Sequence, residues 1–345
     1  PVAGFDGSLA ARFSAPAARA ALAAVTGKTG TLTGTSTLAG LVNPRQPLRM
    51  WCESTDWIAR TKDRLKHVAG ADRPGITVEL AFSTPLSADD VVVMVVPSSQ
   101  VEPVARRLKQ TGPPYPILVT ASKGLERETF RTMSQVIKAV LPEATVAVIS
   151  GPNIAKEIAE GRPAKAVVGC ENVTALIKVA QALRSDRFRL DMTRDTVDLE
   201  LCAAMKGVFA IGAGIIAQRK MGANFMGLMM TFGLREIAEV GKFLGISSSH
   251  IFGITGLGDL VATCFSPDSR NFRLGEFLAA GVPLAEALDR VGMVVEGAMT
   301  ASAVSEMAAL RLRVPLFSAI AAIVENPGEE TIAGFERVLL EYPGC

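Results

Sequence analysis

Histidine and cysteine are scarce in this sequence. It contains two histidines, His67 and His250, which leaves little material for a Ser-His-Asp triad or for a zinc site built on imidazole ligands. The five cysteines lie far apart and form no C-x-x-C pair; they are Cys52, Cys170, Cys202, Cys264 and Cys345. An odd number of scattered cysteines argues against a disulfide framework. We therefore expect no metal and a reducing compartment.

An excess of charge and a long apolar run are also missing. The 36 basic and 34 acidic residues give a net charge of +2, spread along the chain, so no nucleic-acid-binding stripe is indicated. The longest apolar run that we identify, residues 207–217, is shorter than the ~18 residues that a membrane helix needs. We expect neither a nucleic-acid partner nor a transmembrane segment.

Acidic residues are rare at the start of the chain. Residues 1–50 contain one acid, Asp6, against five basic residues, with many Ala, Ser, Thr and Gly. This composition is typical of an organellar transit segment or of its remainder after processing. We interpret residues 1–19 as an N-terminal extension. The location that we expect is the mitochondrial matrix or the cytoplasm.

The rest of the chain has the length and patterning of two domains. With 345 residues, of which 49% are hydrophobic, it can bury a large core. Residues 91–96 are apolar on both faces, as in a strand inside a parallel sheet. Strand and helix patterns alternate from there to about residue 191, and only helical patterns follow. We expect a doubly wound α/β domain over residues 20–192 and an α-helical domain over residues 193–345.

The Gly/Thr-rich stretch 26–39 raises two phosphate-binding interpretations. The string that starts at Gly27 looks like the end of a Walker A loop, but Leu22 stands where the first glycine is required, so we reject that loop. A G-x-G-x-x-G loop would place its glycines at Thr29, Thr31 and Gly34, of which only the last is kept. Threonine at the second position hinders the approach of a pyrophosphate to the backbone. A plain Gly/Thr-rich loop is the alternative.

One lysine stands in the middle of an apolar helical pattern. Residues 195–214 predict a long buried helix with negative charge in its first turn, where the helix dipole favours it. Lys206 shares a stripe of this helix with small residues such as Cys202, Ala203 and Ala210, which leave space for a ligand or another backbone. Alternatively, Lys206 reaches water from a packed helix.

Polar residues follow three predicted strands. Pro97-Ser98-Ser99-Gln100 closes the strand 91–96, Lys123 comes after the strand 116–121, and Gly151 and Asn153 follow the strand 145–150. The carboxyl ends of strands in a doubly wound sheet border the ligand crevice. We therefore expect these residues to face one crevice. Individually, Lys123 could be solvated and Asn153 could cap the next helix.

Two segments of the helical half carry further candidates. The glycine-punctuated segment 253–264 holds one carboxylate, Asp259. Residues 266–271 look like a turn into a helix start, where backbone N–H groups and Arg270 suit a phosphate. Otherwise Ser269 caps the helix and Arg270 lies on the surface.

Taken in order, these motifs resemble those of the NAD-dependent glycerol-3-phosphate dehydrogenases. The resemblance runs from about residue 51 to about residue 340, and the ordered set is much more specific than any single motif. The motifs are Ser122-Lys123-Gly124, Ser150-Gly151-Pro152-Asn153-Ile154-Ala155, the helix 201–206, Gly256-Leu257-Gly258-Asp259-Leu260, Ser269-Arg270-Asn271 and Val294-Val295-Glu296-Gly297.

The resemblance implies an α/β Rossmann-type doubly wound sheet followed by an all-α C-terminal domain, with the active site in the cleft between them. It also implies hydride transfer between C2 of sn-glycerol 3-phosphate and NAD, giving dihydroxyacetone phosphate. Lys206 would be the general acid/base, Lys123 would lie near the same oxygen, and Asp259 would orient both lysines. The implied substrate-binding residues are Gly151, Asn153, Thr263, Ser269, Arg270 and Asn271. The implied cofactor-binding residues are Gly34, Trp51, Ala155, Val294 and Glu296.

The sequence departs from the family pattern outside the glycine loop as well. Gly207 replaces an asparagine that follows the catalytic lysine, and Met226 and Phe232 replace a lysine and an arginine. A second hypothesis is therefore a catalytically degenerate relative that serves as an accessory subunit with protein partners, for example in a mitochondrial complex. A third is a reductase for another small 2-hydroxy or 2-keto acid. We expect a homo-oligomer or a subunit of an assembly.

Overall fold

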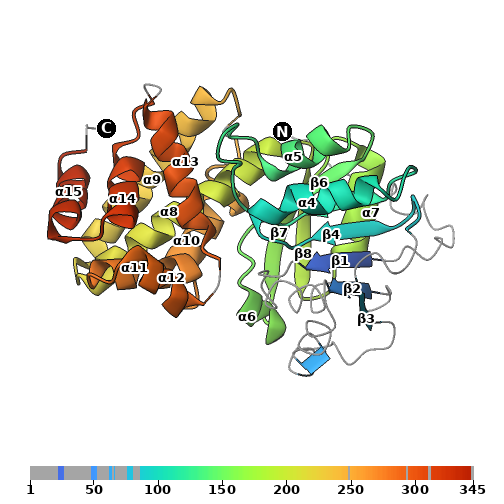
Figure 1. Cartoon of the computed structure of the whole chain (residues 1–345), viewed down its shortest axis with the longest axis horizontal. Helices are drawn as coiled ribbons and strands as arrows, with labels where there is room; N and C mark the ends of the chain where they lie inside the picture. Colours follow the sequence, from blue (N-terminus) through green and yellow to red (C-terminus); the bar gives the residue numbers. More distant parts are fainter. Residues whose placement is uncertain are drawn as a thin grey trace.

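The computed structural model of the chain describes residues 22–26, 48–52, 62–63, 66, 76–80, 86–247, 249–292, 294–309 and 312–342 (Figure 1). The extension 1–19 and most of the Gly/Thr-rich stretch, including Gly34, lie outside these residues. Within them, a β-sheet flanked by helices forms one half of the molecule and a group of helices forms the other (Figure 1).

The first half contains an eight-stranded sheet in the order β3-β2-β1-β4-β5-β6-β7-β8. All neighbouring pairs are parallel except β6 and β7, which are antiparallel. This parallel-dominated sheet confirms the predicted fold class. The strands are β1 (Leu22–Thr26), β2 (Leu48–Cys52), β3 (Ile76–Leu80), β4 (Val91–Met94), β5 (Ile117–Thr120), β6 (Val146–Ser150), β7 (Ala164–Gly169) and β8 (Phe188–Thr193).

Helices cover both faces of the sheet. The alternating side chains of β4 explain this: Val92 and Met94 pack in one core with α4 (Ser98–Lys109) and α5 (Met133–Val140). Val91 and Val93 pack in another core with α7 (Val173–Leu183). Because each face of the strand is buried, β4 reads as one continuous apolar run.

The edge strand β8 was not among the elements predicted from the pattern. Phe188 is buried, but most of the side chains that follow in this strand are exposed or half-buried. Its apolar signal is therefore weak. β8 ends at Thr193 and the next helix begins at Val197. We propose the boundary between the two domains at this short connection.

The second half is built around α8 (Val197–Gln218), which is buried from Asp198 to Ile216. The other elements are α9 (Gly222–Phe243), the π-helical turn η1 (Ile254–Gly258), α10 (Asp259–Cys264), α11 (Arg270–Ala279), α12 (Leu284–Val291), α13 (Glu296–Ala309), α14 (Pro315–Glu325) and α15 (Glu329–Leu340). The short helix α6 (Ala155–Ala159) belongs to the first half.

By length and composition alone, α8 could cross a membrane, although the run 207–217 looked too short. Its apolar stretch is entirely buried in the protein. In Figure 1 the helix lies among the other helices of this half. Its position at the centre of a core accounts for its hydropathy.

Two glycines allow α8 and α11 to cross in backbone contact. A Cβ atom on Gly214 would lie 2.0 Å from the carbonyl oxygen of Phe272, and one on Gly275 would lie 2.0 Å from that of Ile211. No larger residue fits this crossing without moving a helix. The contact fixes the beginning of α11, and with it Arg270, relative to the middle of α8.

Candidate active site between the two halves

Asp259 brings together two lysines from different halves of the molecule. Its carboxylate, at the start of α10, is 1% exposed. The Oδ1 atom forms an ion pair with the Nζ of Lys206 in α8, and the Oδ2 atom lies 3.2 Å from the Nζ of Lys123. Lys123 comes from the loop after β5. The three residues that the resemblance implied for catalysis thus form one cluster.

The buried environment brings the pKa of Lys206 close to neutrality. Burial lowers the pKa of its ammonium to about 7; the carboxylate of Asp259 opposes this shift, and the charge of Lys123 adds to it. An amine with a pKa near neutrality exchanges protons readily at physiological pH. Chemically, the cluster offers a general acid/base beside a second cation.

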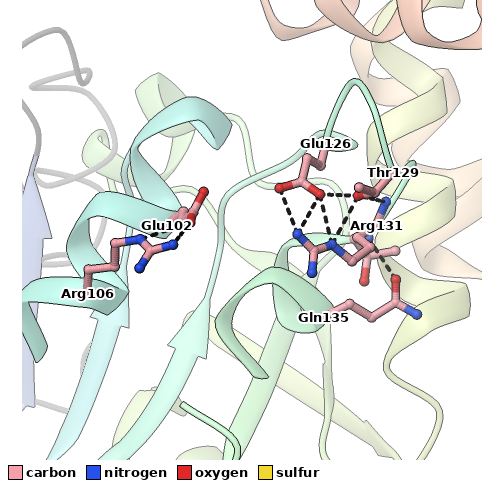
Figure 2. Close-up of polar contacts among 7 residues, drawn as sticks. Glu102, Arg106, Glu126, Thr129, Arg131 and Gln135 are labelled. Carbon is pink, nitrogen blue, oxygen red and sulfur yellow. Dashed lines mark hydrogen bonds and ion pairs between the residues drawn. The ribbon is translucent and has the colours of Figure 1, made fainter. Parts of the chain in front are cut away.

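The loop that carries Lys123 is closed by an ion pair shown in Figure 2. The guanidinium of Arg131 donates to both carboxylate oxygens of Glu126, from Nε at 2.8 Å and from the second nitrogen at 3.0 Å. The side chain of Gln135 accepts from the backbone N–H of Thr132 at 2.9 Å and so helps to cap α5. These contacts hold the loop between β5 and α5 and thereby support the position of Lys123.

Arg270 and Asn271 lie at the beginning of α11. Ser269 is the N-cap of that helix, and its hydroxyl accepts from the backbone N–H of Phe272. Arg270 is half-buried and donates to the carbonyl oxygen of Val294 at 2.9 Å. Asn271 accepts through Oδ1 from the backbone N–H of Gly297 at 3.0 Å. The capping role suggested for Ser269 is therefore observed, whereas Arg270 is not a free surface side chain.

Thr263 lies one helical turn after Asp259. Its hydroxyl donates to the backbone carbonyl of Asp259 at 2.6 Å and lies 3.4 Å from the Oδ1 atom of the same residue. The structure thus places Thr263 beside the two-lysine cluster, with its proton engaged by the helix backbone.

Glu296 joins the two halves at a second point. Its Oε1 accepts from the backbone N–H of Ser98 at 2.9 Å, and its Oε2 accepts from the Ser98 hydroxyl at 2.6 Å. Burial raises the pKa of Glu296, while the hydrogen bonds from Ser98 and the charge of Arg270 oppose that shift. Both carboxylate oxygens are thus engaged by the first residue of α4. Ser98 belongs to the polar stretch 97–100, which follows the strand 91–96 and which the sequence places at the same crevice as Lys123 and Asn153.

The sequence matches two family models. The model of the "NAD-dependent glycerol-3-phosphate dehydrogenase N-terminus" matches residues 20–176, and the model of the C-terminus of the same family matches residues 195–331. The chain belongs to this family. A glycerol-3-phosphate dehydrogenase [NAD(P)+] of Synechococcus sp. (strain JA-2-3B'a(2-13)) is 38% identical over 250 residues, which are 72% of this chain and 79% of that protein. One of Pseudomonas aeruginosa (strain LESB58) is 32% identical over 296 residues, covering 84% and 87%.

A solved structure shares the whole architecture. The crystal structure of glycerol-3-phosphate dehydrogenase from Coxiella burnetii superposes with a TM-score of 0.81 at 26% identity, covering 94% of this chain and 99% of that one. The Rossmann-type first half and the helical second half thus match a dehydrogenase of this family. None of these findings supports the degenerate-subunit alternative or a mitochondrial location.

The carboxyl end of β6 fits the polar ligand that the glycerol-3-phosphate dehydrogenase family implies. The Oγ of Ser150 and the Oδ1 of Asn153 are buried without a hydrogen-bond partner among the described residues. Buried polar atoms are seldom left unsatisfied, so these two suit a ligand. Asn153 does not cap α6, whose N-cap is Ile154. At Gly151, φ is 137°, a conformation that favours glycine.

Less is known of four further cofactor candidates. The backbone of Trp51 pairs with Val25 of β1, and Ala155 is the first residue of α6. The structure does not describe the side chains of these two residues, and Gly34 lies outside the described residues altogether. Val294 contributes its carbonyl oxygen to Arg270. Thr255, four residues before Asp259, has a buried hydroxyl with no partner among the described residues. Its lack of a partner is visible only in the folded chain.

Packing accounts for Gly207, Phe232 and Met226, the three residues outside the glycine loop that depart from the family pattern. A Cβ atom on Gly207 would lie 3.1 Å from the Cα of Gly297 and 3.2 Å from the Nδ2 of Asn271. Glycine thus allows α13 to approach α8 and brings the Asn271 amide beside the residue that follows Lys206. Phe232 is buried and stacks on Tyr342 with 4.1 Å between ring centroids, and Met226 packs against the same core.

Proposed function

We propose that this chain catalyses hydride transfer between sn-glycerol 3-phosphate and NAD(P), interconverting the substrate with dihydroxyacetone phosphate. The observation that carries this proposal is the buried cluster of Lys206, Asp259 and Lys123, which joins the two halves of a family member. The Nδ2 of Asn271 lies beside Gly207, so the beginning of α11 and the lysine cluster adjoin the same segment of α8.

The proton chemistry follows from the state of Lys206. In the oxidation direction, its neutral amine takes the proton of the C2 hydroxyl as the C2 hydride leaves; in the reduction direction, its ammonium returns that proton to the forming alkoxide. Lys123 supplies a second positive charge next to the developing negative oxygen. Asp259 offsets the two ammonium charges and fixes their positions. When bound, the nicotinamide supplies or accepts the hydride.

The residues at the beginning of α11 support a phosphorylated substrate. The Arg270 guanidinium is anchored by one N–H to Val294, and no other described residue accepts a hydrogen bond from it. A planar guanidinium binds phosphate through paired N–H donors. We propose that Arg270 and Asn271 hold the phosphate, with Thr263, Ser269 and the β6 end at Gly151 and Asn153 bordering the substrate.

The cofactor would lie along the carboxyl edge of the sheet, where folds of this class bind dinucleotides. We propose that Ser150 and Glu296 border it from the described part of the chain. The further candidates are Gly34, Trp51, Ala155 and Val294. Because the named relatives are [NAD(P)+] enzymes, both NADH and NADPH are candidate cofactors.

The test is a spectrophotometric assay of NADH and NADPH oxidation with dihydroxyacetone phosphate. Lys206→Met should lower kcat on the order of 10²- to 10⁴-fold, because it removes the acid/base group. Lys178→Met is the matched control, since Lys178 lies on α7 in the first half and pairs with Asp89, which is exposed. Absence of turnover by the wild-type chain with either cofactor, or full activity of Lys206→Met, would contradict the proposal.

A further inference from the structure

Four consecutive residues, 294–297, contact both halves of the molecule; we call them the junction segment. On the side of the helical half, the carbonyl of Val294 accepts from Arg270 at 2.9 Å, and the backbone N–H of Gly297 donates to Asn271 at 3.0 Å. On the other side, both carboxylate oxygens of Glu296 accept from Ser98. The junction segment thus connects the two proposed phosphate ligands to the first half of the chain.

The attachment point on the first half is itself near the proposed cofactor site. Ser98 is the first residue of α4, which follows β4, so it lies at the carboxyl edge of the sheet. Gly124 packs against the same contact: a Cβ atom there would lie 2.9 Å from the Cβ of Ser98 and 3.2 Å from the Oε2 of Glu296. The residue before it is Lys123. A shift of Glu296 would therefore displace both the beginning of α4 and the loop that carries Lys123.

The junction segment has little freedom to absorb such a shift. Gly297 lies in backbone contact with α8, because a Cβ atom there would be 2.5 Å from the carbonyl oxygen of Gly207. Val294 and Gly297 each hold one of the adjacent residues Arg270 and Asn271. Movement of α4 would therefore be transmitted through Glu296 to the phosphate ligands.

We propose that Glu296 is a positioning residue that couples Arg270 and Asn271 to the dinucleotide-binding half, so that the phosphate ester and the cofactor bind with positive cooperativity. The inference rests on the proposed function of the same site. Its physical basis is that a ligand that orders Ser98 also orders the junction segment, so the second ligand meets a lower entropic cost. By linkage, the coupling is the same whichever ligand binds first.

Calorimetry on the full chain measures the coupling without turnover. Glycerol 3-phosphate is titrated into the protein alone and into the protein saturated with NADH, a pair of reduced ligands that cannot react. For the wild type, the dissociation constant measured without NADH, divided by the one measured with NADH, should be about 5–150. Inorganic phosphate, titrated in the same way, should show a ratio in the same direction, because it engages the same two ligands.

Substitutions at Glu296 and at a control position test whether Glu296 carries the coupling between the two ligands. Glu296→Ala should bring the ratio close to one. Glu306→Ala is the matched control, because Glu306 lies on the same helix and pairs with Arg127 of the first half at 2.9 Å, away from the junction segment. It should keep the wild-type ratio. Ser98→Ala, which removes only the hydroxyl donor, should lower the ratio and serves if Glu296→Ala does not fold. A wild-type ratio in Glu296→Ala, or in Ser98→Ala where that variant stands in, overturns the proposal, as does a wild-type ratio of one.

Hydrogen exchange of the ligand-free proteins separates this inference from the proposed function. Glu296→Ala should raise amide exchange in the first turn of α4 and in the first turn of α11 together, while Glu306→Ala should raise neither. Faster exchange confined to α4 would show that Glu296 does not reach the phosphate ligands and would overturn the inference. If the wild type binds neither ligand, the proposed function fails, and this exchange comparison alone decides whether Glu296 joins the two helices. Where Glu296→Ala does not fold, Ser98→Ala takes its place here as well.

Discussion

Asp259 holds the ammonium group of Lys206 in a buried ion pair at the boundary between the two halves of the chain. The same carboxylate reaches Lys123 through its other oxygen. A buried charge is stable only when it is paired, so the carboxylate and the lysines depend on one another. Burial lowers the pKa of Lys206, and the partner that opposes this shift comes more than fifty residues later in the sequence.

Asp259→Asn should lower activity and change its pH dependence. The carboxylate is the group that raises the pKa of Lys206 against burial, so its removal should move that pKa below about 7. The acidic limb of the pH profile for glycerol 3-phosphate oxidation should therefore shift to lower pH, with kcat reduced on the order of 10²-fold. Steady-state rates between pH 5 and 9 measure both effects.

The control for this change is Asp191→Asn, because Asp191 forms an exposed ion pair with Lys165 in the first half. Its pH profile should coincide with that of the wild type. An unshifted acidic limb in Asp259→Asn would show that Lys206 does not set the profile.

Arg270→Lys should weaken substrate binding more than turnover. Lysine keeps the charge but loses the planar N–H pair and the anchoring contact to Val294. KM for dihydroxyacetone phosphate should rise about 10- to 100-fold, which corresponds to roughly 1.4 to 2.8 kcal/mol. Dihydroxyacetone, which has no phosphate, should be reduced with unchanged kcat/KM. Arg290→Lys, at an exposed pair on α12, is the matched control. Equal effects on both substrates would exclude a phosphate-specific role.

Much of the fold could be predicted from the sequence, because it depends on local signals such as the buried run at β4, which predicted a sheet interior. The grouping of Lys206, Lys123 and Asp259 was expected only from the family resemblance, because the local pattern around Lys206 also allowed a lysine that reaches water. The edge strand β8 escaped because only its first residue, Phe188, carries a clear burial signal.

The contacts that join the halves could not be predicted in the same way. Glu296 and Ser98 are 198 residues apart, and nothing in either local pattern indicates the other. Gly207 illustrates a different limit: the sequence suggested the loss of a useful amide, whereas the structure shows a glycine that admits α13 and the amide of Asn271. Such close approaches are properties of packing between helices rather than of either helix alone.

Gly214→Ala should destabilise the helical half. The added Cβ atom would lie 2.0 Å from the carbonyl oxygen of Phe272, so α8 and α11 must separate. Overpacking of a core typically costs about 1–3 kcal/mol, and displacement of a backbone contact should reach the upper end. Gly227→Ala is the control, because that position in α9 has open space around it. Alanine there should raise stability by roughly 0.5–1 kcal/mol. Urea unfolding of both variants measures the difference, and equal midpoints would contradict the crossing.

Glu236→Gln should flatten the pH dependence of stability between about pH 5 and 7. Burial raises the pKa of Glu236 to about 7, although the backbone N–H groups of Leu316 and Phe317 and the hydroxyl of Tyr342 donate to its carboxylate and oppose the shift. The folded state therefore holds this proton more tightly than the unfolded state. The resulting contribution to the free energy of unfolding is fully present below pH 4.5 and is lost as pH rises through about 7.

A shift of this size corresponds to about 3 kcal/mol as an upper limit. Burial likewise raises the pKa of Glu200 to about 7 and also raises that of Glu296, so the wild type should lose stability with rising pH through all three carboxyls, and Glu236→Gln should lose less than the wild type. Lys206 has the opposite effect at higher pH. Because its pKa is lowered to about 7, the folded state binds this proton less tightly than the unfolded state, and the resulting penalty in the free energy of unfolding is relieved as pH rises above that value. Urea unfolding at pH 5, 6 and 7 measures the slope. Glu286→Gln, in an exposed pair with Arg290, should keep the wild-type slope. If Glu236→Gln also keeps it, Glu236 does not hold a proton in the folded chain near neutrality.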